Sequence, residues 1–90
     1  MAVQVRVPSL LQKFTGGAKV LEYDGATIAD LITSIDRDHP GFRDQLLEHG
    51  ELRRFVNIFL NDEDIRFLEH LNTPLADGDV IAILPALAGG

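Results

Sequence analysis

The sequence has 90 residues, with 8 Lys and Arg against 14 Asp and Glu, and its formal net charge is −6. A chain of this length forms one small domain, which excludes the large dinucleotide-binding and barrel enzymes. The negative charge and the scattered cationic residues argue against nucleic acid and against an anionic membrane surface, but they are compatible with a basic protein partner. The absence of cysteine excludes a disulfide, a thiolate zinc site and a thiol nucleophile.

Neither a signal peptide nor a membrane span is predicted. Residues 1–7 alternate in polarity and contain no apolar signal core. The longest apolar run, residues 80–88, is interrupted by Pro85 and is shorter than the roughly 20 residues that a membrane span needs. We therefore expect a cytoplasmic protein.

The first quarter of the chain predicts two strands. The alternating valines of residues 3–7 indicate a half-buried strand that ends at Pro8. Residues 9–17 predict a connection longer than a tight turn, with its apolar side chains folded under it. Residues 18–23 predict the second strand, in which we expect Val20 to point inward.

One long helix is predicted after this hairpin. Thr27, with Asp30 three residues later, resembles a capping box at a helix start. Apolar residues then recur at the spacing i, i+3, i+4 and i+7, which predicts that one face packs on a sheet; they are Ile28, Leu31, Ile32 and Ile35. The sequence His39-Pro40-Gly41 ends the helix, and residues 42–47 predict a short second helical turn that Gly50 closes.

The second half of the chain predicts three strands. Residues 54–60 form the clearest one, with Val56, Ile58 and Leu60 on one side and Phe55, Asn57 and Phe59 on the other. After a turn at residues 61–64, a short strand is expected at residues 65–67. Leu71 and Leu75 should be buried under an irregular stretch. A turn at residues 76–79 leads into the last strand, residues 80–84, which Pro85 ends.

The order of these elements is hairpin, helix, strand, short strand and strand. A mixed sheet of four or five strands, with one main helix packed on one face, buries every apolar stripe. A βαβ crossover then joins the second strand to the third. This α+β arrangement is the β-grasp, or ubiquitin-like, fold. We expect residues 1–85 to form the domain, residues 86–90 to form a flexible tail, and the core to include Val5, Ile32, Ile58 and Ile83.

No self-sufficient catalytic site is predicted. The three histidines lack metal-ligand spacing, and we interpret them as surface residues. The acidic run at residues 62–64 lacks the glycine and the glutamate that an EF-hand calcium loop requires. Gly16-Gly17 precedes a strand and not a helix, so these residues do not form a phosphate-binding loop. The sequence therefore predicts no metal site and no bound cofactor.

The C-terminal residues are the most informative part of the sequence. After Pro85 the chain has only small residues and one leucine, and it ends in Gly89-Gly90. A frayed terminus is the ordinary interpretation, but glycine lacks Cβ and lets a backbone pass through a narrow channel. Residues 85–90 reach about 20 Å when extended. That length suffices to place the carboxylate of Gly90 in the active site of a partner.

Three segments carry a family resemblance that covers residues 3–90. They are RFVNIFLNDEDIRF at residues 54–67, TPLADGD at residues 73–79 and ILPALAGG at residues 83–90. With them the chain resembles the sulfur-carrier proteins of the β-grasp superfamily. This superfamily includes the small subunit of molybdopterin synthase, the thiamine-pathway sulfur carrier and the carrier of a cysteine-biosynthesis route. Residues 54–67 are most similar to the last of these.

The resemblance implies a carrier protein with no enzymatic activity of its own. It implies that an E1-like enzyme adenylates the carboxylate of Gly90 with ATP, and that a sulfur donor converts the product into a thiocarboxylate. A PLP-dependent cysteine synthase then accepts the sulfur, and a zinc metallopeptidase releases cysteine. ATP, PLP and zinc thus belong to the partners. Leu87, Ala88 and Gly89 are implied to be the tail that enters them.

Three other interpretations remain open at this point. The first is the small subunit of molybdopterin synthase, which inserts its tail into the large subunit. The second is a ubiquitin-like modifier that is joined to lysines. The third is a β-grasp interaction domain whose Gly-Gly end is accidental.

A docking face is expected on the side of the sheet that the helix does not cover. Its predicted residues are Phe55, Phe59, Val80, Ala82 and Leu84. An apolar patch on an open sheet face usually marks a partner site. The alternative is that loops cover one or two of these side chains.

Overall fold

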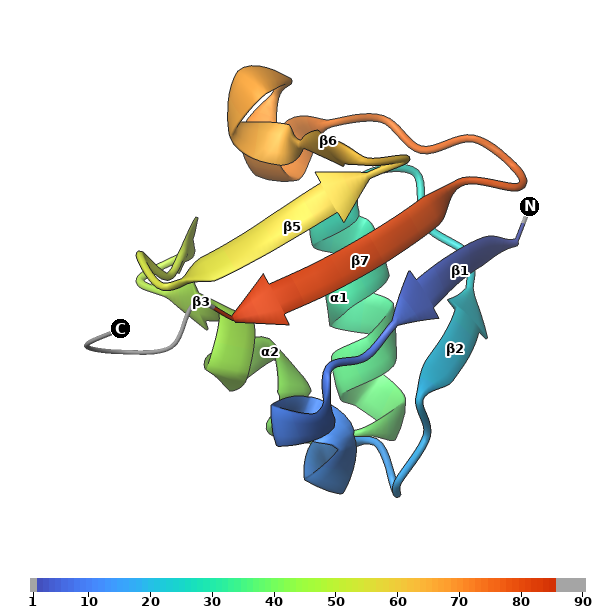
Figure 1. Cartoon of the computed structure of the whole chain (residues 1–90), viewed down its shortest axis with the longest axis vertical. Coiled ribbons are helices and arrows are strands. Elements are labelled where there is room, and N and C mark those ends of the chain that lie inside the picture. Colours follow the sequence, from blue (N-terminus) through green and yellow to red (C-terminus); the bar gives the residue numbers. More distant parts are fainter. Residues whose placement is uncertain (1, 86–90) are drawn as a thin grey trace.

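The structure, a computed structural model, describes residues 2–85. Of Pro85 it describes the backbone alone. Within these residues a five-stranded sheet has the order β2-β1-β7-β5-β6. Figure 1 shows its strands as a single twisted layer. The strands are β1 (Val3–Arg6), β2 (Val20–Tyr23), β5 (Val56–Leu60), β6 (Glu63–Asp64) and β7 (Val80–Pro85).

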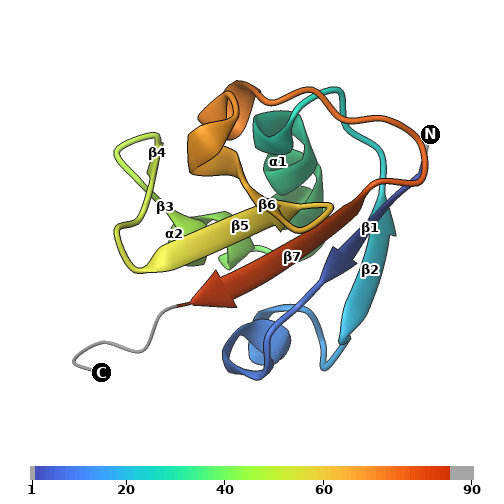
Figure 2. The same cartoon turned by 45° about the horizontal axis from the view of Figure 1, so that its top comes forward.

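Two α-helices follow the first hairpin. Helix α1 (Ile28–Asp38) crosses one face of the sheet, and α2 (Phe42–Leu46) follows it (Figures 1 and 2). A small separate hairpin pairs β3 (Leu47–Glu48) with β4 (Glu51–Leu52). Three 3₁₀ helices complete the described part of the chain: η1 (Ser9–Phe14), η2 (Ile65–Phe67) and η3 (His70–Asn72).

The sheet is mixed, as predicted. β1 and β7 pair in parallel in its centre, whereas the β1–β2, β5–β7 and β5–β6 pairs are antiparallel. Helix α1 lies in the crossover between β2 and β5, which takes the chain from one side of the sheet to the other (Figure 1). The predicted β-grasp fold, with one main helix on one face of a five-stranded sheet, is confirmed.

The start and the buried face of α1 follow from its sequence. The side chain of Thr27 accepts a hydrogen bond from the backbone N–H of Asp30 at 3.2 Å, which caps the first turn. The predicted apolar stripe is buried in full: Ile28, Leu31, Ile32 and Ile35. One hydrophobic core also holds the other residues predicted there, Val5, Ile58 and Ile83.

Some local predictions were wrong. Val20 does not point inward and is 47% exposed, because the inward positions of β2 are Leu21 and Tyr23. Residues 65–67 form a 3₁₀ helix rather than a strand, capped by Asp64, whose side chain accepts from the backbone N–H of Arg66. In the first connection Leu11 is buried, but Leu10 is exposed.

Two smaller predictions had mixed outcomes. Leu75 is buried as expected, but Leu71 is only partly buried. The hairpin of β3 and β4, with its turn at His49 and Gly50, was not predicted. Of the helices in residues 2–85, none has the length and apolar character needed to span a membrane.

Candidate functional site

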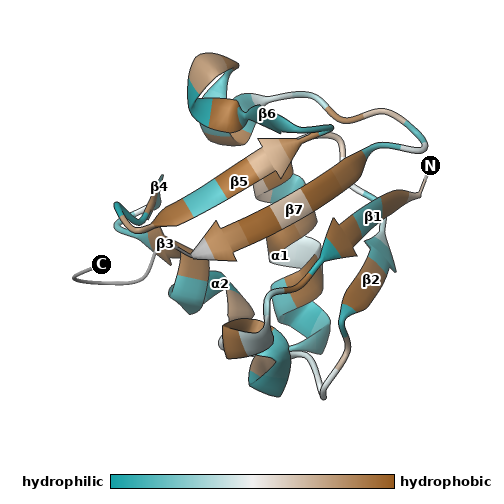
Figure 3. Ribbon diagram, viewed as in Figure 1, coloured by the Kyte–Doolittle hydropathy of each residue, from teal (hydrophilic) through white to brown (hydrophobic). Residues whose placement is uncertain are grey.

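The open face of the sheet is built by alternate residues of β5 and β7. On β7, Ile81 and Ile83 are buried toward α1, so Val80, Ala82 and Leu84 lie on the opposite face. In Figure 1 the helix lies behind the sheet, and the front of β5 and β7 carries no helix of the described chain. Figure 3 shows that β7 is apolar along most of its length. The central strand therefore presents apolar residues on both faces.

Strand register places Ala82 in the middle of this open face, with Phe59 beside it. Phe59 pairs with Ala82, and Ala82 pairs on its other side with Arg6 of β1. Leu84 pairs with Asn57 near the start of β5. Phe59, Val80 and Ala82 are half-buried, whereas Leu84 is 51% exposed.

Phe55 is the one predicted docking residue that does not lie on a strand. It occupies a turn before β5, closed by a 3.1 Å hydrogen bond from the N–H of Val56 to the carbonyl of Arg53. The strand thus begins two residues later than predicted. Phe55 is nevertheless 56% exposed, so it adds apolar surface beside the open face rather than on it.

Asn61 fixes the first residue of β7 against the end of β5. Its side chain accepts a hydrogen bond from the N–H of Val80 at 2.9 Å and donates one to Asp79 at 2.9 Å. The N–H of Asn61 also donates to the carbonyl of Val80. Asn61 and Asp62 have φ angles of 48° and 72°, the backbone of a tight hairpin turn. The acidic tip of the β5–β6 hairpin is therefore held beside the open face.

The far end of β7 leads toward the predicted tail. Pro85 pairs with Val56 at the start of β5. The four predicted tail residues lie outside the described residues: Leu87, Ala88, Gly89 and Gly90. The root of the tail, Pro85, therefore lies beside β5, at the same end of the open face as Leu84.

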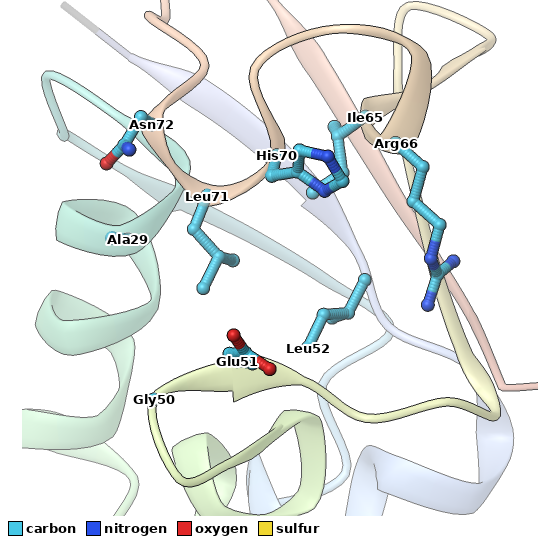
Figure 4. A pocket seen from close by; sticks show the side chains of 9 residues that line it. All are labelled: Ala29, Gly50, Glu51, Leu52, Ile65, Arg66, His70, Leu71 and Asn72. Atoms are coloured by element: carbon cyan, nitrogen blue, oxygen red, sulfur yellow. The ribbon is translucent and has the colours of Figure 1, made fainter.

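A groove of about 580 Å³ lies on the helix side of the sheet, between α1, the β3–β4 hairpin and the η2–η3 segment. Figure 4 shows Leu52, Ile65 and Leu71 at its apolar part, with charged or polar side chains around them. The polar residues of its lining are Glu51, Arg66, His70 and Asn72. No sequence signal pointed to this groove, because its residues come from three segments with no shared motif.

Arg66 is a second feature that no sequence signal indicated. Its guanidinium group donates to the side chain of Asn57 at 2.8 Å and to the carbonyls of Val56 and Arg53 at 2.8 and 3.2 Å. The predicted strand at residues 65–67 would have placed this side chain on one face of the sheet, and not along the outer edge of β5. Within residues 2–85, no three His, Asp or Glu side chains gather closely enough to hold a metal ion.

The fold and this site define a class of protein, a ubiquitin-like β-grasp domain with an apolar open face and a Gly-Gly sequence after its last strand. Comparisons with known proteins narrow the class. Residues 5–90 match the family model described as the ThiS family. The chain belongs to the ThiS family.

Named relatives agree with this assignment over the whole chain. The chain is 43% identical over 93 residues to the sulfur carrier protein CysO of Mycobacterium tuberculosis, and the match covers 100% of both proteins. It is 43% identical to the CysO chain in a crystal structure of the BexX/CysO complex of Amycolatopsis orientalis, with a TM-score of 0.95 over 99% of this chain and 100% of that one. The small archaeal modifier protein 1 of Methanosarcina acetivorans is 31% identical, with a TM-score of 0.85 over 99% of this chain and 96% of that chain.

These findings confirm the predicted resemblance and the prediction of a sulfur carrier of the cysteine-pathway type. CysO is named a carrier and not a catalyst, which agrees with the prediction that the protein is no enzyme. The complex with BexX shows that one CysO associates with a partner protein.

Proposed function

We propose that this protein carries sulfur as a thiocarboxylate on Gly90 and delivers it for cysteine biosynthesis. The observation that carries the proposal is the full-length match to CysO at 43% identity, in which Gly89-Gly90 of this chain is included. The apolar open face next to the root of the tail supports it, because a carrier needs a surface by which an activating enzyme holds it.

The chemistry explains why activation is needed. An α-carboxyl group has a pKa near 3.5, so at neutral pH it is an anion and a poor electrophile. Attack of the Gly90 carboxylate on the α-phosphate of ATP forms an acyl adenylate and releases pyrophosphate. Hydrosulfide, or a donor that supplies it, then attacks the carbonyl carbon, AMP leaves, and a thiocarboxylate remains.

The open face is proposed as the docking surface for the E1-like enzyme. Phe59, Ala82 and Leu84 would be covered on binding, and Phe55 and Val80 would extend the contact. The net charge of −6 favours a partner with a basic rim, with an association rate that falls as salt rises. Glycines at positions 89 and 90 leave the tail narrow enough for a deep active site.

The later partners are proposed from the same family. A PLP-dependent cysteine synthase would take the sulfur when the thiocarboxylate attacks a serine-derived aminoacrylate, and a zinc metallopeptidase would release cysteine and restore Gly90. ATP, PLP and zinc act in those enzymes. The predicted cytoplasmic location stays a prediction.

A protein modifier is the second candidate, favoured by the 31% identity to a small archaeal modifier protein. In that case the adenylated Gly90 would pass to lysine side chains instead of to sulfide. A molybdopterin synthase small subunit would in contrast form a stable complex with its large subunit. Isopeptide-linked adducts on many proteins, or co-purification of that subunit, would favour these alternatives.

The test is incubation of the protein with ATP, the E1-like enzyme of the same organism and sulfide, followed by intact mass. The wild type should gain the mass difference between sulfur and oxygen. Deletion of Gly90 should abolish the gain, because the carboxylate then stops about 3.5 Å short of the nucleotide. Gly89→Val should strongly reduce it, since a β-branched side chain adds bulk and stiffness in the channel. Equal sulfuration of the deletion variant would refute the proposal.

A further inference from the structure

Within the described residues, the first half of β5 has a neighbouring strand on only one of its edges. β7 pairs with all of β5, from Val56 to Leu60, whereas β6 pairs only with Phe59 and Leu60. The outer edge of residues 56–58 therefore faces η2 instead of a neighbouring strand. Edge carbonyl groups that lie in a partly buried place need other hydrogen-bond donors.

The Arg66 side chain supplies such a donor to the carbonyl of Val56. One terminal nitrogen, Nη2, donates to the carbonyl of Val56 at 2.8 Å and to that of Arg53 at 3.2 Å, and Nη1 donates to the side-chain oxygen of Asn57 at 2.8 Å. Each of the three bonds is charge-assisted, because the donor is the guanidinium cation. The planar group thus joins the backbone of the turn before β5, the carbonyl of Val56 and the side chain of Asn57.

The backbone of Arg66 is itself fixed. Its N–H donates to the side chain of Asp64 at 2.8 Å, which caps η2, and the preceding Ile65 is fully buried. Arg66 thus reaches β5 from an anchored base. By contrast, Arg54 lies exposed in the turn itself.

The two β5 residues that Arg66 bonds also pair with the last two residues of β7. Val56 pairs with Pro85, and Asn57 pairs with Leu84. Phe55, exposed beside the open face, lies in the turn that Arg66 ties to β5. A single side chain therefore fixes both the strand that orients the last residues of β7 and the turn that carries Phe55.

The geometry points to Arg66 as a positioning residue that fixes the end of β7, where the tail begins, together with Phe55, for docking on the activating enzyme. This inference rests on the proposed function, because it assigns Arg66 a part in presenting Gly90. Arg66 would act through β5 and β7 and not on the carboxylate itself. If the root of the tail samples several directions, only a fraction f of the carriers is competent, and the apparent KM for the carrier rises by 1/f while kcat is unchanged.

The test uses Arg66→Gln, with Arg66→Lys as the conservative variant and Arg54→Gln as the matched control. Hydrogen exchange of the free protein is measured first. In Arg66→Gln we expect the amides of residues 56–58 and 83–84 to exchange about tenfold faster, while those of β1 and β2 keep their wild-type rates. Arg66→Lys should be intermediate, because an ammonium group lacks the planar fork. Arg54→Gln should match the wild type.

ATP–pyrophosphate exchange with the E1-like enzyme is measured second, below the unfolding temperature of every variant. We expect Arg66→Gln to raise the KM for the carrier about fivefold or more, with kcat within about twofold of wild type. Unchanged hydrogen exchange in Arg66→Gln, or a uniform rise in hydrogen exchange over the whole sheet, would overturn the inference. A loss in kcat alone would do the same. If the wild type itself is not adenylated, the proposed function fails, and the hydrogen-exchange result still decides whether Arg66 holds the root of the tail.

Discussion

The two faces of the sheet are made by alternate residues of the same strands, yet they differ in their exposure to solvent. On the side of α1, Val5, Ile58, Ile81 and Ile83 are 0–3% exposed. On the other side, Leu84 is 51% exposed and Phe59, Val80 and Ala82 are half-buried. Both of these sets are apolar, although the open face also holds Asn57 and Arg6, which pair with Leu84 and Ala82. A sheet that faces a core on one side and water on the other usually alternates apolar with polar residues.

This difference separates what the fold needs from what the function needs. The residues under α1 stabilise the domain, because their burial removes apolar area from water. The residues on the open face gain much less from folding, so their apolar character calls for another explanation. A partner that covers them, as we propose for the activating enzyme, gives one.

The largest expected effect comes from the covered face. Ile58→Ala should lower the free energy of unfolding by about 2–5 kcal/mol, because Ile58 is 1% exposed and its truncation leaves a cavity. Urea unfolding at equilibrium measures this. At a temperature where the variant stays folded, adenylation should continue at the wild-type rate. A loss below about 1 kcal/mol would show that this face is less tightly packed than the structure indicates.

The neighbouring residue tests the open face. Phe59→Asp should keep the fold but lower kcat/KM for adenylation about tenfold or more, because binding would bury an unpaired charge in an apolar contact. Val20→Asp is the control, since Val20 is 47% exposed at the far edge of the sheet and should tolerate the charge. Thermal unfolding verifies that both variants fold. Wild-type kinetics for Phe59→Asp, or equal losses in both, would remove Phe59 from the docking surface.

The smallest effect concerns the contact of α1 with the sheet edge. Tyr23 donates a hydrogen bond to Asp38 at 2.7 Å; burial, this bond and the charge of Asp38 raise the pKa of Tyr23 above 10.0. A folded pKa above the unfolded one stabilises the protein below pH 10 and is lost as pH rises through the folded value. Tyr23→Phe should therefore cost less than about 1 kcal/mol at neutral pH.

The pH dependence is the sharper observation for Tyr23. The stability difference between wild type and Tyr23→Phe should be constant from neutral pH up to about pH 9 and should shrink above pH 10. Urea unfolding of both proteins across this pH range measures the stability difference. A difference that grows with rising pH would contradict the raised pKa.

The main helix and the core were predictable from sequence because their signals are local and repeated. Thr27 with Asp30 marks the start of α1, and four apolar residues at helical spacing mark its face. Period-two alternation identified β1, β5 and β7 in the same way. The five predicted docking residues follow from that alternation too, and four of them lie on the open-face strands.

The errors occur where a pattern is short, or where strand pairing decides which side of the sheet a residue faces. In β2 both alternate sets contain apolar residues, and the register with β1, which pairs Val20 with Arg6, sets which one faces outward. Ile65 and Phe67 are two residues apart, as in a strand, but a 3₁₀ turn buries the first and leaves the second 82% exposed. Arg66 binds residues 9 to 13 positions earlier in the chain, and no local motif encodes such a contact.

The most direct measurement of the central claim is the intact mass of this protein isolated from its own cells, before and after treatment that hydrolyses thiocarboxylates. We predict a fraction whose mass exceeds that of the plain chain by the difference between one sulfur and one oxygen, located at Gly90 by fragmentation and absent after hydrolysis. A protein found only with the plain carboxylate, or only joined to lysines of other proteins, under conditions of active cysteine synthesis would contradict the carrier function.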